Sequence, residues 1–493
     1  MTGSMRPLPH SSPSVSRRFV LAATAWAAAL ALWACTPLRA QTIVTVDLDK
    51  RHQTIEGFGA CLISWDPDME RLYASASFQD AYLGQLGASM LRINLWGPSL
   101  PDPVPDWHDI SFEHFKPEGE GHRVAMFLAA AKEFRMVDPA LRLIGTVWSP
   151  PAWMKENHAI VDRGPGAIDG ASYAYNGSKI DNRVSRRFYP HFVKWLVEMA
   201  KMHKAQGVPL YAISPGNEVM FTQAFESCVW DADDFAQIVG MLGEQLAKEG
   251  LGDVLIYGPE TMTSSNWGKG IANDAYVQAI AADPKARRYL TRWATHGYTD
   301  GFTTDTSKDS ARQFWNTIAA THKPFWITEC GTGSHDWPAA LNGIGAMIHN
   351  ALVDGNASAF LPWQAAEKKP DEHALLVADK LTAKSRAAQH WFKFVRPGAV
   401  RVETTPATGV VPTSAFVHDA NNTLTIVLVN PTRTALPVTL ALTGAQRLGQ
   451  MQVYRTTLNE AFEQQAAVAV QHGKIFVTMP PESMVTLHGK PLH

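Results

Sequence analysis

The chain has 493 residues, of which 46% are hydrophobic and 18% are charged, and its formal net charge is −2. Such a composition supports a large buried core and excludes a chain that is disordered throughout. The nearly balanced charge, without a long basic run, argues against nucleic acid as a partner.

The N-terminus reads as an export signal. The basic pair Arg17 and Arg18 precedes an apolar run, Phe19–Ala34, and small residues follow near Ala40, which is the order of a cleaved signal peptide. We therefore expect residues 1–40 to be removed. The basic pair also resembles a twin-arginine signal, and acylation of Cys35 is the alternative to simple cleavage. The mature protein is expected to be secreted or periplasmic, with no stable membrane span.

Beyond the signal, short apolar runs alternate with helical stretches, which is typical of parallel βαβ units. Eight such runs predict a (β/α)8 barrel, a TIM barrel, over residues 54–392. The predicted strands are Thr54–Ala60, Met90–Leu95, Arg142–Ser149, Tyr211–Val219, Val254–Thr261, Ala294–Tyr298, Pro324–Cys330 and Ala357–Gln364. Amphipathic spacing predicts outer helices at Val124–Phe134, Phe188–Gln206 and Ala232–Glu249.

The pattern changes after Arg396-Pro397-Gly398. Strand-like runs with turn residues between them, and no convincing helix, predict a C-terminal β-sandwich over residues 393–493. Its predicted strands are Leu424–Asn430, Val438–Leu442, Gln452–Arg455 and Ile475–Met479. Residues 41–53 read as one further strand, which we expect to join the same sandwich. The fold class is thus α/β, a TIM barrel with an attached β-sandwich.

Polar side chains gather where the predicted barrel strands end, which is the active-site face of such a barrel. Hydrolysis of a glycosidic bond ordinarily needs two carboxyl groups, and Glu218 and Glu329 supply them from strands four and seven. One strand-terminal Glu alone is more often an ion-pair partner than a catalyst. The combination with other strand-end groups favours a glycosidase. Those groups are Arg92, Asn217, His296, Tyr298 and Trp363, and Trp148, Trp153 and Glu260 also lie at strand ends.

The same constellation resembles the glycosidase clan whose acid/base ends strand four and whose nucleophile ends strand seven. Within that clan the chain is similar to glycoside hydrolase family 30 over nearly its whole mature length. The matching stretches are Gln53–Gly59, Leu91–Asn94, Trp148–Lys155, Asn217–Glu218, Phe225–Trp230, Trp326–Glu329 and Phe392–Gly398.

The resemblance implies a retaining β-glycosidase in which Glu329 is the nucleophile and Glu218 the general acid/base. Arg92 would lower the pKa of the nucleophile, and Asn217 would bond the sugar 2-hydroxyl. His296 and Tyr298 are expected to bond the nucleophile or the sugar, with a satisfied core position as the equal alternative.

Indole rings stack well on sugar rings. Trp148, Trp153 and Trp363 are therefore candidate stacking platforms. For Glu260 the residues favour structural support over catalysis.

Family 30 substrates include xylans, β-1,6-glucans, β-1,6-galactans and β-glucosides such as glycosylceramides. The Phe225–Trp230 stretch resembles that of the xylan-acting members, and this resemblance favours xylan or glucuronoxylan. Pro215-Gly216 before Asn217, and Val219 after Glu218, depart from the usual Gln-Asn-Glu-Pro of the family. The substrate, and the choice between internal and terminal cleavage, therefore stay open.

No metal-ligand spacing or nucleotide-binding motif occurs, so no metal or cofactor is implied. Three cysteines remain after the signal, Cys61, Cys228 and Cys330, and we interpret them as packing residues. The expected partner is an oligo- or polysaccharide, and the expected state is a monomer. The alternative function is a catalytically inactive glycan-binding protein on the same fold.

Overall fold

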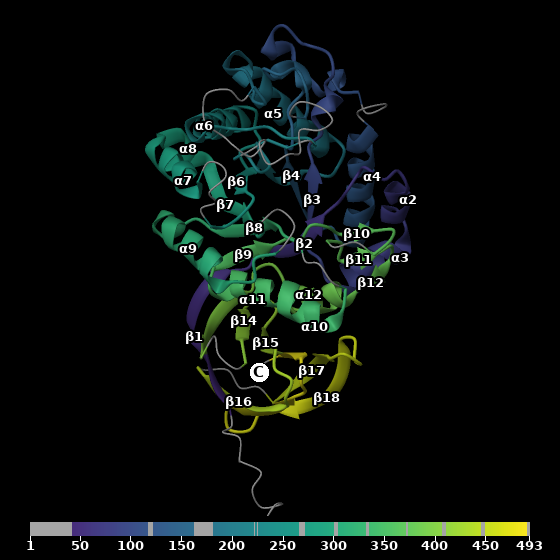
Figure 1. The fold of residues 1–493 in the computed structure, drawn as a ribbon, viewed down its shortest axis with the longest axis vertical. Helices are drawn as coiled ribbons and strands as arrows, with labels where there is room; N and C mark the ends of the chain where they lie inside the picture. Colours follow the sequence, from purple (N-terminus) through teal and green to yellow (C-terminus); the bar gives the residue numbers. More distant parts are fainter. Residues whose placement is uncertain are drawn as a thin grey trace, which may run out of the picture. The chain divides into compact units, whose positions relative to one another are not determined.

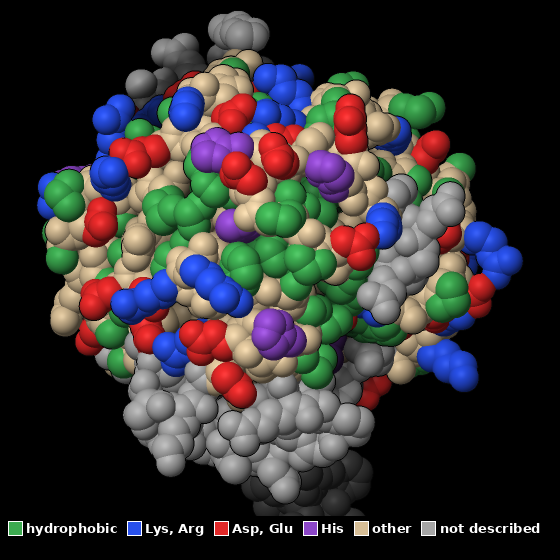
Figure 2. Space-filling view, turned by 90° about the horizontal axis from the view of Figure 1, so that it is seen from above, with side chains coloured by type: hydrophobic (Ala, Val, Ile, Leu, Met, Phe, Trp, Pro, Cys, Tyr) green, Lys and Arg blue, Asp and Glu red, His purple; other side chains and the backbone are tan. Residues whose placement is uncertain are grey.

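The computed structural model describes residues 42–116, 122–161, 181–220, 222–223, 225–265, 272–299, 304–331, 335–370, 373–406, 411–444 and 449–490. The predicted signal, with Cys35, lies outside the described residues. Of the helices in this described part, none combines the length and the apolar character that crossing a bilayer requires. On the face seen in Figure 2, Lys and Arg are interspersed with Asp and Glu, and hydrophobic side chains gather near the middle.

Eight parallel strands close into a barrel in chain order, from β2 to β9 (Figure 1). This arrangement confirms the predicted fold class. The barrel strands are β2 (Gly57–Cys61), β3 (Met90–Asn94), β4 (Arg142–Thr146), β5 (Leu210–Ser214), β6 (Leu255–Thr261), β7 (Leu290–His296), β8 (Phe325–Glu329) and β9 (Ala357–Phe360).

The barrel strands are short and apolar because both of their faces are covered. All five residues of β8 are buried, for example. Side chains from seven of the eight strands, β3 to β9, and from Leu361 just after β9 fill the barrel interior in one cluster. Its members are Met90, Ile144, Ala212, Tyr257, Ala294, Trp326, Ala359 and Leu361.

The end of the barrel at which the strands begin is closed by an ion pair. Glu56 accepts hydrogen bonds from the Trp326 indole at 2.8 Å and from Arg292 Nε at 2.9 Å. A closed end of this kind serves stability, and it leaves the opposite end, where the strands finish, for chemistry.

Helices cover the barrel. In α5, apolar Phe192, Trp195, Leu196 and Met199 recur at helical spacing and are buried, as the amphipathic pattern requires. The helices are α2 (Asp68–Tyr73), α3 (Ala76–Gln79), α4 (His122–Val137), α5 (Tyr189–Ala205), α6 (Ala232–Lys248), α7 (Asn273–Ala282), α8 (Pro284–Tyr289), α9 (Lys308–Ile318), α10 (Trp337–Ala340), α11 (Ala346–Val353) and α12 (Ala383–Phe392). A small sheet after β9 contains β10 (Ala366–Glu367), β11 (Leu376–Val377) and β12 (Lys380–Leu381).

The second domain is built from both ends of the described chain. Nine strands form one sheet in the order β18-β17-β20-β15-β14-β13-β1-β16-β19. The sheet folds back on itself as a sandwich. Inward side chains of both halves share one core that includes Val44, Leu428, Leu440 and Leu487. The strands are β1 (Thr42–Thr54), β13 (Val400–Thr405), β14 (Thr413–His418), β15 (Thr423–Asn430), β16 (Leu436–Thr443), β17 (Gln450–Thr456), β18 (Glu463–Ala469), β19 (Lys474–Met479) and β20 (Ser483–Gly489).

Helix α12 joins the barrel to this sheet. His390 lies between the hydroxyls of Thr486 and Thr456, at 2.7 Å and 2.8 Å, and the Trp391 indole donates to Ser414 Oγ at 3.0 Å. Figure 1 shows α12 between the barrel and this sheet. Burial of these polar groups is tolerated because each has a partner.

Two details differ from the sequence expectation. The run predicted as Tyr211–Val219 is shorter as a strand, because β5 ends at Ser214 and the chain turns before Glu218, whose φ of 46° does not fit a strand. The sheet also contains β13, β14, β18 and β20, which were not predicted. Strand β18, with five exposed residues out of seven, lacks the apolar alternation that reveals a strand in sequence.

Candidate active site

The polar groups singled out in the sequence come together at the end of the barrel where the strands finish. Glu329 is the last residue of β8 and His296 the last of β7. Arg92 lies on β3, and Glu218 lies on the segment that follows β5. Residues far apart in sequence thus share one small volume because parallel strands end on the same side of the barrel.

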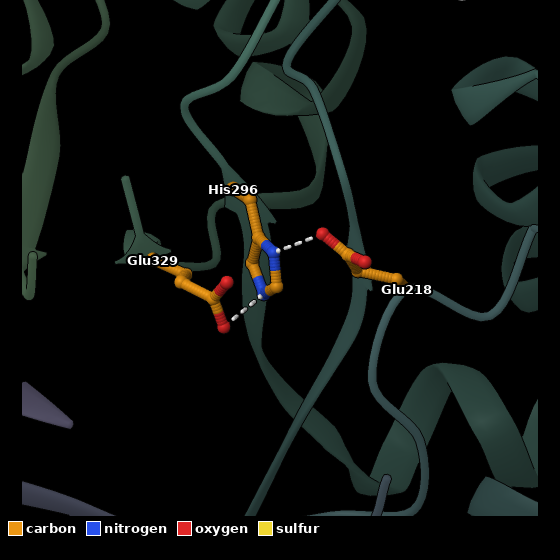
Figure 3. Close-up of side chains that lie close together, drawn as sticks. All are labelled: Glu218, His296 and Glu329. Atoms are coloured by element: carbon orange, nitrogen blue, oxygen red, sulfur yellow. Dashed lines mark hydrogen bonds and ion pairs between the residues drawn. The ribbon is translucent and has the colours of Figure 1, made fainter. Parts of the chain in front are cut away.

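Glu218 and Glu329 face each other across His296 (Figure 3). One carboxylate oxygen from each, and a ring nitrogen of His296, all lie within 4.8 Å of one another. Each Glu is only 7% exposed. Retaining glycosidases hold their two carboxyl groups about 5–5.5 Å apart, whereas inverting enzymes leave about 6.5–9.5 Å for a water molecule. The spacing here matches direct attack by one carboxylate.

Arg92 is the central cation, and its side chain is fully buried. Its Nη1 donates to Glu329 Oε2 at 2.7 Å, and its Nη2 donates to Asn217 Oδ1 at 2.6 Å. The guanidinium also lies 4.4 Å from the centroid of the Trp148 ring. With its amide oxygen bound to Arg92, Asn217 keeps its amide N–H groups for another acceptor.

Two further groups hold the carboxylates. His296 Nδ1 lies 3.0 Å from Glu218 Oε1, and its Nε2 lies 3.7 Å from Glu329 Oε2. The Tyr298 hydroxyl donates to Glu329 Oε1 at 3.2 Å. His296 and Tyr298 therefore contact the carboxyl groups of Glu218 and Glu329 and are not merely core residues.

The charges of the cluster depend on each other. Burial lowers the pKa of His296, but Glu329, Glu218 and Glu260 outweigh it and raise the pKa to about 9, so the imidazole is charged at neutral pH. Burial raises the pKa of Glu329, His296 and Arg92 oppose this, and Glu218 adds to it. Arg92 therefore acts on the pKa of Glu329 in the expected direction, but burial and the second carboxyl group exceed its effect.

Hydrogen-bond donors surround both carboxyl groups. Glu329 receives the permanently charged Arg92 and the Tyr298 hydroxyl. An ionised carboxylate accepts such bonds best. These two donors favour the ionised form of Glu329, while His296 Nδ1 and the side-chain amide of Gln223 contact Glu218.

Tryptophan rings form one side of the site. Trp148 and Trp363 have ring centroids 5.9 Å apart, and Trp363 lies 5.7 Å from Trp65. Trp148 is buried, whereas Trp65 is 52% exposed, so the rings lead from the carboxylates toward solvent. Trp153 lies elsewhere, since its indole donates to Leu100 O at 3.0 Å and its ring packs edge-on against Phe188 and His191.

Besides Trp65, sequence reasoning missed Gln223 and Thr146 at this site. Gln223 donates from its side-chain amide to Glu218 Oε2, and Thr146 Oγ1 accepts from Arg92 Nε at 3.2 Å. Thr146 ends β4, so its position at a strand terminus was the available signal. Gln223 lies on an irregular segment, and no sequence pattern marks it.

The cysteines pack in the interior, and Cys61, Cys228 and Cys330 are all free and buried. Burial raises the pKa of Cys61 to about 12 and that of Cys228 to about 11, so both thiols stay protonated at neutral pH. This agrees with a packing role.

A divalent cation fits poorly among the grouped ligands Glu218, His296 and Glu329. The guanidinium of Arg92 lies 2.7 Å from Glu329 Oε2, so an added cation would be placed beside a buried positive charge. His296, with its raised pKa, would also have to lose its proton to bind a metal.

Comparison with known proteins supports the same assignment. Residues 398–487 match the model of the glycosyl hydrolase family 30 β-sandwich domain. Glucuronoxylanase XynC of Bacillus subtilis (strain 168) is 25% identical over 412 residues, which cover 81% of each chain. An endo-1,6-β-D-glucanase of Neurospora crassa is 28% identical over 187 residues, 35% of each chain.

The fold is shared with a solved xylanase of glycoside hydrolase family 30, Xyn30A of Clostridium acetobutylicum. That structure has a TM-score of 0.70 and 20% identity, and the match covers 91% of this chain and 99% of the xylanase. The sandwich model matches one domain, and the Bacillus relative extends the likeness over 81% of the chain, so the chain is similar to glycoside hydrolase family 30 enzymes.

Proposed function

We propose that the protein hydrolyses β-glycosidic bonds in a glycan with retention of anomeric configuration. The observation that carries this proposal is the placement of Glu218 and Glu329, whose nearest carboxylate oxygens lie within 4.8 Å of each other. That spacing suits a carboxylate that attacks the anomeric carbon without an intervening water.

In the first step Glu329 attacks the anomeric carbon, and the bond from that carbon to the leaving oxygen breaks. Glu218 gives its proton to the leaving oxygen, so the departing sugar leaves as an alcohol. Arg92 at 2.7 Å and Tyr298 at 3.2 Å hold the attacking carboxylate in place. The product of this step is a glycosyl ester of Glu329.

In the second step water attacks the same carbon from the side that the leaving group vacated. Glu218, now ionised, accepts a proton from that water, and the bond to Glu329 breaks. The two inversions restore the original configuration. The amide N–H groups of Asn217 are placed to donate to the sugar 2-hydroxyl, where contacts strengthen in the transition state.

For the substrate we propose xylan or glucuronoxylan. The support is the glucuronoxylanase relative, whose likeness runs over 81% of this chain. The rival is β-1,6-glucan, because the endo-1,6-β-D-glucanase relative has the higher identity, 28%, although over only 35% of the chain.

The test is product analysis of the purified mature chain on xylan, glucuronoxylan, β-1,6-glucan, β-1,6-galactan and aryl β-glycosides, with the anomeric proton followed by NMR. Initial release of the β-anomer supports the double displacement, and initial release of the α-anomer contradicts it. The length of the products distinguishes internal from terminal cleavage. A folded protein that binds a glycan of the panel without cleaving it would support the binding-protein alternative.

We also propose that the chain is exported and starts after Ala40. The support is the basic pair Arg17 and Arg18 before the apolar run Phe19–Ala34. N-terminal sequencing of protein recovered from culture medium or periplasm tests this. Recovery of a chain that still carries its first residues would contradict it.

A further inference from the structure

A third carboxyl group, Glu260, lies beside Arg92 and His296, which also contact Glu329. It is fully buried near the end of β6. Its Oε1 lies 3.1 Å from Arg92 Nη2 and 3.8 Å from His296 Nε2. Arg92 and His296 are also the two cations that contact Glu329, so Glu260 shares both of them with the nucleophile.

Neighbouring groups keep Glu260 in its ionised form. The Thr146 hydroxyl donates to Glu260 Oε2 at 2.9 Å. Burial raises the pKa of Glu260, but Arg92 and His296 outweigh it and the pKa is lowered. A permanent carboxylate at this depth is a large local charge, and in the low dielectric of the barrel it acts strongly on its neighbours.

The backbone of Glu260 also touches the acid/base residue. The Glu218 N–H donates to the Glu260 carbonyl at 2.9 Å. Both residues have left-handed backbone angles, φ 46° for Glu218 and φ 55° for Glu260. Such angles strain a non-glycine residue, and they cluster at functional sites. The two strained positions hold each other in place.

The charges around Glu260 can be counted. The titratable or charged groups that face it are Cys61 on β2, Arg92 on β3, Tyr257 on β6, His296 on β7, Glu329 on β8 and, through its backbone, Glu218. Burial raises the pKa of Cys61 to about 12 and that of Tyr257 well above its usual value, so both are neutral.

The site then contains two cations, which are Arg92 and His296, and three carboxyl groups. The carboxyl groups belong to Glu218, Glu260 and Glu329. If all three were ionised, one negative charge would remain uncompensated in a buried site, which is strongly unfavourable. One carboxyl group must therefore hold a proton. Without Glu260, Arg92 and His296 would balance Glu218 and Glu329 in their ionised forms, and no proton would be needed.

We propose that Glu260 is a positioning residue whose negative charge sets how many protons the carboxyl groups of the site hold. As a result, Glu218 carries the proton that acid catalysis requires. Glu260 touches neither the sugar nor the breaking bond, and it acts through Arg92, His296 and the Glu218 backbone. This inference rests on the proposed function, because it explains how the general acid of that reaction comes to hold its proton.

The first test is the pH profile of kcat/KM for Glu260→Gln, which removes the charge and keeps the shape. With an aryl β-glycoside whose leaving group needs protonation, the basic limb is expected to move to lower pH by about one unit or more. With a 2,4-dinitrophenyl leaving group, which needs no proton, activity is expected to persist at pH values above that basic limb. Glu260→Asp keeps the charge and is expected to restore most of the wild-type profile.

The matched control is Glu198→Gln. Glu198 is a buried carboxyl on α5 that pairs with Lys194 and Lys201 at 2.8 Å each, away from the site. Its replacement also removes a buried charge but is expected to leave both limbs in place. If Glu260→Gln lowers the rate while its limbs coincide with those of the wild type, Glu260 is only structural and the inference is wrong.

A second test does not depend on turnover or on the folding of a Glu260 variant. Infrared difference spectroscopy of the wild type at neutral pH is expected to show the C=O band of one buried protonated carboxyl group in the site, and Glu218→Gln is expected to lose it. Absence of this band in the wild type overturns the inference. If the band is present but no aryl glycoside is cleaved, the proposed function is wrong, while the inference that one carboxyl group of the site is protonated still holds.

Discussion

Removal of the Glu218 carboxyl group separates the two steps of the proposed reaction. In Glu218→Ala, Glu329 keeps its bonds from Arg92 and Tyr298, so the nucleophile remains ready to attack. What is lost is the proton donor of the first step and the base of the second. General acid or base catalysis contributes roughly 10²–10⁴-fold, which corresponds to about 3–5 kcal/mol of activation free energy.

The leaving group decides which step reveals the loss. For an unactivated glycoside, kcat/KM of Glu218→Ala is expected to fall by the full ~10²–10⁴-fold, because the leaving oxygen needs the proton. For a 2,4-dinitrophenyl glycoside, kcat/KM is expected to stay within about tenfold of the wild type. The second step is still slow, so the glycosyl-enzyme accumulates and a burst of phenolate precedes a low steady rate.

The assay is stopped-flow release of dinitrophenolate, with mass spectrometry of the quenched protein to detect the sugar ester on Glu329. Glu329→Ala is the comparison, and it is expected to lose activity on every leaving group without a burst. If Glu218→Ala loses kcat/KM equally on activated and unactivated glycosides, Glu218 is not the acid/base and the reasoning from the site geometry is refuted.

Three other changes have expected outcomes. Arg92→Lys keeps a positive charge but loses the fork that binds Glu329 and Asn217 together, so kcat should fall by about 10²-fold with little change in KM, and unchanged steady-state constants would contradict the role of Arg92. Trp363→Ala should raise KM by about tenfold with a smaller effect on kcat, measured on the glycan that the wild type cleaves, because a stacking surface of about 1–3 kcal/mol is lost. Burial lowers the pKa of His390 to about 3, so its contribution to stability is present above the unfolded pKa near 6.5 and is lost as pH falls toward 3. From pH 7 to 5 this loss is about 2 kcal/mol, and His390→Gln should flatten the pH dependence of the unfolding midpoint, whereas an unchanged slope would exclude His390 as its source.

The barrel and the proposed catalytic pair were predictable because their signals are local. Apolar runs of five to nine residues separated by amphipathic helices indicate parallel strands, and a Glu near the end of such a run, as at Glu329, must face the open end of the barrel. The sandwich was recognised for the same reason where its strands alternate, and missed where they do not, as in the exposed β18.

The details of the site were less accessible. Trp153 belongs to the same motif as Trp148, yet the two rings point to different places, because the chain turns after β4. The Trp153 indole donates to the Leu100 carbonyl, whereas the Trp148 ring lies beneath Arg92. Gln223 reaches Glu218 from an irregular segment. A backbone path without regular periodicity carries no sequence signature of where its side chains point.

The sequence by itself determined which chemical groups the protein brings to its active site, because residue types and strand positions are local properties of the chain. Only the tertiary structure decided how these groups share charge. Glu260 could not be distinguished from an ordinary ion-pair residue until the barrel placed it 3.1 Å from Arg92 and 3.8 Å from His296. The reason is physical: electrostatic energies depend on distance and burial, and both arise only when strands far apart in sequence close into one barrel.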